Sequence, residues 1–246
     1  DDLEPTVDLD AMRRIPQVLR DSDWKVTAVI VDELLIDIEP GDTTASHHAL
    51  AFDLGTTTVV ATLLDTTIGT PVAVASMLNK QQPFGGDVIT RISATMMDPE
   101  ALPKWTQLAQ DTLAELTENV CTEAGIDPGQ VYEVALAGNA TMVSLLLGID
   151  PEPIGVAPFI LSSRIIPIVT AADIGISIHP AAPAYILPSL GAYVGGDIIA
   201  GTLASGMDRD KRLRLFIDVG TNCEIVLGDG ERLLSTAAPA GPAFEG

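Results

Sequence analysis

Residues Ala49 to Thr58 read ALAFDLGTTT, and residues Leu213 to Asn222 read LRLFIDVGTN. In each stretch an apolar run leads to an aspartate, and the aspartate is followed by a glycine and a threonine two and three positions later. A second apolar run follows each turn, so each copy predicts a strand, a tight polar turn and a second strand. One copy alone is typical of an ordinary hairpin. Two copies, much farther apart than the repeats of a solenoid, indicate duplicated domains.

The two turns carry the same chemistry. Glycine lets the backbone turn tightly and lets a ligand approach closely, and turn amides and hydroxyls can donate hydrogen bonds to phosphate oxygens. The expected phosphate-binding residues are Gly55, Thr56, Thr57 and Thr58 in the first copy and Gly220, Thr221 and Asn222 in the second. Asp53 and Asp218 would repel phosphate, so they predict a hydrated Mg²⁺ between them and an attacking water that both orient.

The remaining pattern predicts an α/β protein. From residue 49 we expect three antiparallel strands, helices over 87–97 and 104–123, a buried strand over 131–137, a short helix over 140–147 and an irregular insert over 150–184. Next come a strand over 185–190, a helix over 195–203 and the second set of strands. Residues 1–48 predict a helix over 11–20 and strands over 26–31 and 34–38, and His47 and His48 fall in a solvated linker.

The composition and net charge of the chain argue against some classes of partner and favour a compartment. The 246 residues are 47% hydrophobic but 4% aromatic, so aliphatic side chains must fill the core. The formal net charge of −21 argues against nucleic acid and anionic lipid as partners. No stretch predicts a membrane span or a signal peptide. Two cysteines, Cys121 and Cys223, match no metal spacing and indicate a reducing cytoplasm, where both are expected to be packing residues.

The two turns resemble the phosphate motifs of the actin, sugar-kinase and heat-shock-chaperone ATPases. Further motifs are similar to those of the reductive activators of corrinoid proteins across nearly all of residues 49–246. These motifs are NKQQPFGGDVITRI from Asn79, AGNATM from Ala137, PSLGAYVGGD from Pro188 and APAGPAFEG from Ala238. The resemblance implies a ribonuclease-H-like fold of the actin and sugar-kinase type. Residues 49–204 would form its first subdomain and residues 205–246 the truncated start of its second. Residues 1–48 would be part of a small α+β middle domain.

By this resemblance the chain is the ATP-binding and ATP-hydrolysing part of an activator that reduces Co(II) to Co(I) in a corrinoid protein. ATP and Mg²⁺ would bind here, and the electron would come from a [2Fe–2S] ferredoxin domain that precedes this piece. A homodimer is compatible with this reading. Two alternatives have the same fold. One is a small-molecule kinase, although the sequence shows no obvious carboxylate that would act as its catalytic base. The other is a non-catalytic actin-like scaffold.

Asn139 has both a structural and a functional interpretation, and so does the pair Asp87 and Arg91. Asn139 follows a buried strand and either faces the nucleotide or caps the next helix. Asp87 and Arg91 are four positions apart on an expected helix, and that spacing favours an exposed ion pair over a contact with a partner.

Overall fold

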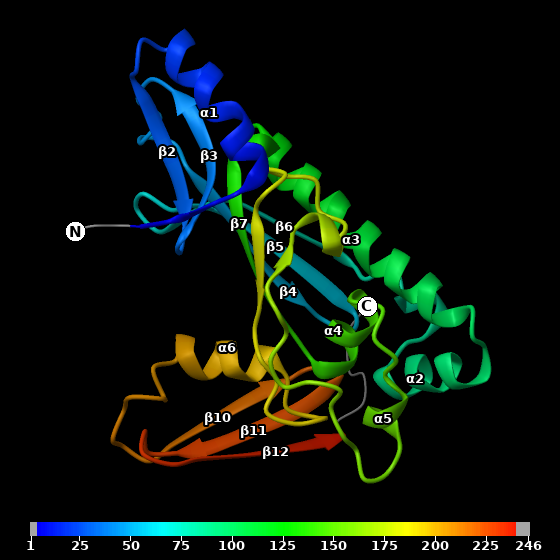
Figure 1. Cartoon of the computed structure of the whole chain (residues 1–246). Helices are drawn as coiled ribbons and strands as arrows, with labels where there is room; N and C mark the ends of the chain where they lie inside the picture. The colour runs from blue at the N-terminus through cyan, green and yellow to red at the C-terminus, as the bar shows by residue number, and fades with distance from the viewer. Residues whose placement is uncertain (1–3, 240–246) are drawn as a thin grey trace.

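The computed structural model describes residues 4–239, which contain three β-sheets (Figure 1). A six-stranded sheet has the order β6-β5-β4-β7-β9-β8. Two three-stranded sheets flank it in the sequence, with the orders β1-β3-β2 and β10-β11-β12. The large sheet lies at the centre of the molecule, and the small sheets lie on opposite sides of it.

The N-terminal sheet carries one helix. Strands β1 (Thr6–Val7), β2 (Val26–Val31) and β3 (Leu34–Pro40) form it, and helix α1 (Leu9–Asp21) packs on β3. Asp8 caps α1, because its side chain accepts hydrogen bonds from the backbone N–H groups of Asp10 and Ala11. The predicted helix and both predicted strands are present: β2 has the expected bounds, and α1 and β3 are slightly longer than expected.

The central sheet begins with the predicted antiparallel strands, β4 (His48–Leu54), β5 (Thr58–Asp65) and β6 (Thr70–Leu78). Strand β7 (Val131–Gly138) is parallel to β4, with Asp53 opposite Ala137, and β9 (Pro183–Ile186) is parallel to β7. Strand β8 (Val169–Thr170) forms the antiparallel edge. The carboxyl ends of β4 and β7 therefore meet at one edge of the sheet.

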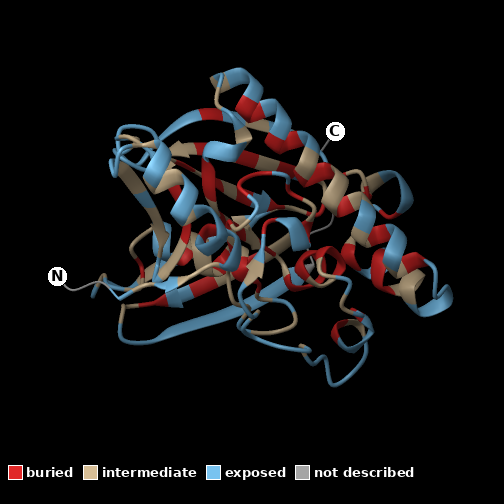
Figure 2. Cartoon of the chain, turned by 45° about the horizontal axis from the view of Figure 1, so that its top comes forward, coloured by how far each residue is buried: buried red, intermediate tan, exposed pale blue. Residues whose placement is uncertain are grey.

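Buried residues alternate with less buried ones along β4, and Figure 2 colours the whole chain by burial. Leu50, Phe52 and Leu54 are buried in the main core, whereas Ala51 and Asp53 face the other side of the sheet. Helix α3 (Ala101–Ala124) covers the core face through Trp105, Leu113 and Leu116, among others. As predicted, α3 ends at Gly125, whose φ of 68° is one that glycine adopts readily.

Three shorter helices surround the carboxyl edge of the sheet. Helix α2 (Val88–Met97) is capped by Asp87, and α4 (Ala140–Leu146) follows β7 directly. Helix α5 (Glu152–Gly155) opens the otherwise irregular insert and packs against α2.

The C-terminal sheet is attached through helix α6 (Gly196–Ala204). Its strands β10 (Arg214–Val219), β11 (Asn222–Gly228) and β12 (Leu233–Pro239) are antiparallel, as the repeat predicts. Ile198 of α6 packs with Met207 and Val226 in a small separate core.

Two expectations in the fold were wrong. His48 is not a solvated linker residue: it is the first residue of β4 and is 6% exposed. The strand expected over 185–190 instead spans Pro183–Ile186, so it begins and ends earlier than predicted.

Candidate functional site

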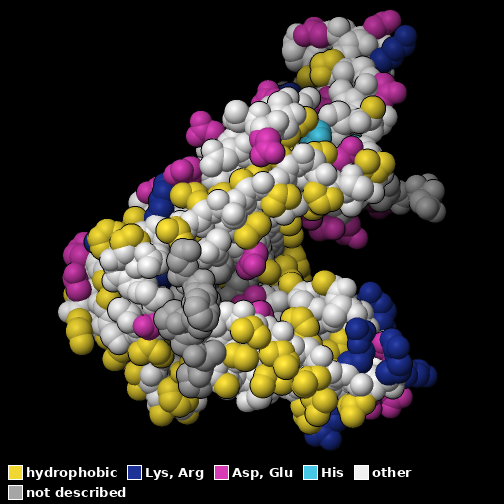
Figure 3. All heavy atoms as spheres, turned by 180° about the vertical axis from the view of Figure 1, so that it is seen from behind, with side chains coloured by type: hydrophobic (Ala, Val, Ile, Leu, Met, Phe, Trp, Pro, Cys, Tyr) yellow, Lys and Arg dark blue, Asp and Glu magenta, His cyan; other side chains and the backbone are white. Residues whose placement is uncertain are grey.

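A cavity of about 750 Å³ separates the central sheet from the C-terminal lobe, and Figure 3 shows the molecule hollowed there. Its walls come from the β4–β5 hairpin, the β10–β11 hairpin, α6 and the carboxyl end of β7. The two hairpins touch at their tips, where Thr57 Oγ1 and Thr221 Oγ1 are 3.0 Å apart. The duplicated sequence motifs therefore face each other across one space.

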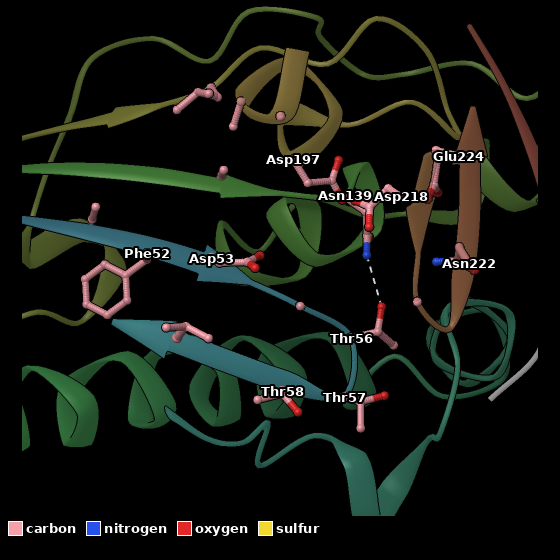
Figure 4. Close-up of a pocket in the computed structure, with 18 of the residues that line it drawn as sticks. Phe52, Asp53, Thr56, Thr57, Thr58, Asn139, Asp197, Asp218, Asn222 and Glu224 are labelled. Atoms are coloured by element: carbon pink, nitrogen blue, oxygen red, sulfur yellow. Dashed lines mark hydrogen bonds between the residues drawn. The ribbon is translucent and has the colours of Figure 1, made fainter. Parts of the chain in front are cut away.

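All ten residues that the sequence analysis assigned to the site line this cavity (Figure 4). They are Asp53, Gly55, Thr56, Thr57, Thr58, Asn139, Asp218, Gly220, Thr221 and Asn222.

Gly55 is required by the shape of the first turn. A Cβ on this residue would lie 2.3 Å from the carbonyl oxygen of Thr58. No side chain fits at that distance, so the turn depends on glycine.

Asn139 caps the next helix, as one interpretation predicted, and it also lines the cavity. Its Oδ1 accepts a hydrogen bond from the backbone N–H of Met142 at 3.0 Å and so caps α4. Its Nδ2 donates to Thr56 Oγ1 at 3.0 Å, across the mouth of the first turn. The residue thus joins the carboxyl end of β7 to the first turn inside the cavity.

Two further carboxylates line the cavity, and the sequence analysis missed both. Asp197 lies at the start of α6 and is the last residue of the motif PSLGAYVGGD, which was noted only as part of the family resemblance. Glu224 is 8% exposed and sits directly opposite Asp218 on the neighbouring strand. The predicted hairpin is the signal that could have found Glu224, because the second strand brings it back beside Asp218. The duplication gives no such signal, because Val60 stands opposite Asp53 in the first copy.

The carboxylates raise one another's pKa values. Desolvation raises the pKa of Asp53, and the charge of Asp218 adds to the effect. Burial raises the pKa of Asp197 to about 6, with Asp218 and Asp53 contributing. Burial also raises the pKa of Glu224 to about 7, helped by Asp197 and Asp218. Among the described residues that line the cavity there is no Lys or Arg to compensate this negative charge, and such a site favours a cation.

The donor set fits a hydrated cation better than a closed metal cage. Within residues 4–239, no three His, Cys, Asp or Glu side chains gather closely enough to hold a metal by themselves. Mg²⁺ normally keeps several waters and uses one or two carboxylates together with phosphate oxygens. Asp53 and Asp218 could fill that role on opposite walls of the cavity.

The predicted ion pair between Asp87 and Arg91 is wrong. Arg91 is fully buried beneath the first turn, and Asp87 instead accepts hydrogen bonds from Thr90 as the cap of α2. Burial lowers the pKa of Arg91 to about 10, so the guanidinium remains charged at neutral pH. Spacing suggested an exposed pair, but the helix turns this position toward the sheet.

None of the helices within residues 4–239 is long and apolar enough to cross a membrane. Cys121 is a buried free thiol and Cys223 a partly buried one.

Comparison with known proteins gives a consistent picture along the whole chain. The family model of the RACo middle region matches residues 48–210. The model of the C-terminal domain of RACo, the ASKHA domain, matches residues 212–246, and that of the RACo linker region matches residues 1–45.

Individual relatives agree with these matches. The chain is 36% identical to the corrinoid activation enzyme RamQ of Eubacterium limosum over 98% of its length. It is 24% identical, over 81% of its length, to the [Co(II) methylated amine-specific corrinoid protein] reductase of Methanosarcina barkeri. These alignments cover 43% and 37% of the relatives, so the chain spans about two fifths of their length.

A solved structure described as a reductive activator for corrinoid, iron-sulfur protein superposes with a TM-score of 0.93 at 37% identity. The match covers 98% of this chain and 39% of that one. The central sheet, the connecting helix and the second hairpin have the actin-like ATPase architecture that the duplicated motif predicted. The chain belongs to the family of reductive activators of corrinoid proteins.

Proposed function

We propose that this chain is the ATP-binding and ATP-hydrolysing part of an activator that drives reduction of Co(II) to Co(I) in a corrinoid protein. The observation that carries the proposal is the meeting of two Asp-x-Gly-Thr hairpins across one cavity, with Thr57 and Thr221 in contact at their tips. Membership of the family supports the corrinoid protein as partner.

The two hairpins would bind the triphosphate from opposite sides. Hydroxyl and amide donors come from Thr56, Thr57 and Thr58 on the first turn and from Thr221 and Asn222 on the second. Asp53 and Asp218 would hold a hydrated Mg²⁺, whose charge neutralises the phosphate oxygens.

The same carboxylates would orient the water that attacks the terminal phosphate. Asp53 and Asp218 accept hydrogen bonds from that water and so fix its direction of approach. Asp197, with a pKa of about 6, can accept a proton released into the cavity near neutral pH.

Coupling to cobalt reduction would be conformational. Nucleotide contacting both hairpins binds the closed arrangement of the lobes better than an open one, and that differential affinity shifts the equilibrium between them. The electron must come from another domain, for which we propose a [2Fe–2S] ferredoxin domain, because this chain has two cysteines and a cluster takes four. That cluster would supply the one electron that reduces Co(II) to Co(I) in the corrinoid protein.

We prefer this function to a small-molecule kinase of the same fold because the chain belongs to the family of the corrinoid-protein activators. We further propose that the protein acts in the cytoplasm, in line with its free thiols, and that the strong negative charge excludes nucleic acid as a partner.

Calorimetry with ATPγS and Mg²⁺ tests the proposal. In the full-length protein, Asp53→Asn and Asp218→Asn should each abolish the Mg²⁺ dependence of nucleotide binding. Asp21→Asn, the same charge change on the exposed end of α1, should bind like wild type. If wild type binds no nucleotide, the ATPase function is wrong and a scaffold role takes its place.

A further inference from the structure

The backbone carbonyl groups of the first phosphate-binding turn accept hydrogen bonds from residues outside the turn. Gly55 O accepts a hydrogen bond from Asn79 Nδ2 at 3.0 Å, and Thr57 O accepts one from the backbone N–H of Asn79 at 2.8 Å. Between them, Thr56 O accepts a hydrogen bond from Arg91 Nη2 at 2.6 Å. Three successive carbonyls of the turn are thus held by two residues of one segment.

That segment lies outside the hairpin. Asn79 follows β6 and Arg91 is on α2, and both side chains are fully buried. Arg91 donates further hydrogen bonds to Gly85 O at 2.8 Å, to Gln81 Oε1 at 2.7 Å and to Met142 Sδ at 2.9 Å. Among the ion pairs of residues 4–239, none involves Arg91, so its charge is directed at neutral acceptor atoms of the turn and its surroundings.

A buried guanidinium without a carboxylate is costly, and its position therefore calls for a reason. A turn whose carbonyls are fixed on one side presents its N–H groups on the other, where they can bind an anion. A carbonyl that rotated into the cavity would oppose a phosphate oxygen with its own partial negative charge. The charge of Arg91 both prevents that rotation and adds positive potential behind the turn.

We propose that Arg91 and Asn79 are positioning residues for the first phosphate-binding turn. They do not contact the ligand; they fix the turn in the conformation that binds a triphosphate. The sequence motif from Asn79 to Arg91 would then serve the phosphate site, although it begins 21 residues after Thr58, the last residue of the turn. The inference rests on the proposed ATP binding.

Three variants of the full-length protein test it. Arg91→Met removes the charge and all donors at similar volume, Arg91→Lys keeps the charge with a single nitrogen, and Arg13→Met is the control on exposed α1. Two quantities are measured: the Kd for ATPγS with Mg²⁺, and amide hydrogen exchange of residues 54–58 and of strand 131–138 without nucleotide.

We expect Arg91→Met to weaken ATPγS binding about 10- to 100-fold, the range typical of partners that orient a binding group. Residues 54–58 should exchange faster in this variant while strand 131–138 does not, because the defect is local to the turn. Arg91→Lys should fall between Arg91→Met and wild type, and Arg13→Met should equal wild type.

A folded Arg91→Met protein that binds ATPγS within twofold of wild type would overturn the inference. If Arg91→Met does not fold, the near-isosteric Asn79→Asp, which loses the hydrogen-bond donor to Gly55 O, provides the same comparison. If neither variant folds, the role of these residues is purely structural and the inference is overturned as well. Absence of binding in wild type would defeat the proposed function instead, and the exchange of residues 54–58 would still decide whether Arg91 holds the turn.

Discussion

At the scale of single residues, two substitutions of Asn139 distinguish its effect on protein stability from its effect on nucleotide binding. Asn139→Asp keeps the Oδ1 acceptor for Met142 and so keeps the cap of α4, but it loses the donor to Thr56 and adds a negative charge to the cavity. We expect roughly tenfold weaker ATPγS binding, the effect of about one charge-assisted hydrogen bond, with little change in Tm.

Asn139→Ala is the matched comparison. It loses the cap as well, which costs about 1 kcal/mol of unfolding free energy. Calorimetry and thermal unfolding of the two variants check both effects. Binding by Asn139→Asp equal to that of wild type would show that the Thr56 contact is irrelevant to the site.

Glu224 should make stability depend on pH. Its folded pKa of about 7 lies above its unfolded value, so the folded state retains a proton that the unfolded state releases. The free energy of unfolding therefore decreases as the pH rises from about 4.5 to about 7, and the loss persists above that. Glu224→Gln lacks this penalty and should be more stable than wild type at pH 8, by roughly 2 kcal/mol, and nearly equal to it at pH 4.

Urea unfolding at the two pH values measures the difference. Glu118→Gln, an exposed change on α3, is the control and should follow wild type at both. A constant difference between Glu224→Gln and wild type across pH would rule out titration of Glu224 as the cause.

The sequence revealed those site residues that the repeat marks and missed those that only folding brings together. Asp53 and Asp218 stand out because the same pattern surrounds both. Asp197 reaches the cavity because α6 begins beside β7, and Arg91 reaches the turn because α2 faces inward. Neither orientation can be read from spacing along the chain.

At the scale of elements, α6 depends on a glycine at its contact with the second lobe. A Cβ on Gly201 would lie 2.4 Å from Cζ of Phe216 on β10. Gly201→Ala gains helix propensity of about 1 kcal/mol, but overpacking of this kind costs about 1–3 kcal/mol. We therefore expect a net loss of stability in urea unfolding.

The double variant Gly201→Ala with Phe216→Leu makes room for the new methyl group and should recover part of the loss. A single variant more stable than wild type would show that the ring moves away without cost.

Most elements were predictable because their patterns are local. The β4–β6 hairpins follow alternation and turn residues, and α3 follows helical spacing up to Gly125. The bounds of β9 and the burial of His48 were predicted wrongly. Strand β9 is defined by its pairing with β7, and His48 is buried beside β5 and β7. Both contacts are with segments distant in the sequence.

At the scale of the whole molecule, a polar cluster of Asp37, Arg14 and His179 connects the N-terminal sheet to the central sheet. Asp37 on β3 pairs with Arg14 at 2.6 Å and with His179 Nε2 at 3.1 Å, and Asp37 and His179 are both buried. His179 Nδ1 accepts a hydrogen bond from the N–H of Ala181, so Nε2 carries the proton donated to Asp37. Nearby, the Tyr132 hydroxyl donates to Glu39.

Asp37→Ala leaves a buried imidazole without its acceptor, and we expect a loss of roughly 2–4 kcal/mol in unfolding free energy. Asp10→Ala breaks an exposed ion pair with Arg13 and should cost about 0.5 kcal/mol or less. Urea unfolding compares the two, and equal losses would show that the buried cluster does not fasten the sheets.

The contact between Thr57 and Thr221 also predicts an order of events in time. The hairpin tips touch, so we expect them to separate before a triphosphate can lie between the two turns. Association would then include a unimolecular opening step, and in stopped-flow experiments the observed rate should level off at high nucleotide concentration instead of rising linearly. The same contact should slow departure, so we predict a long residence time for spent nucleotide and a cycle whose rate is set by its release.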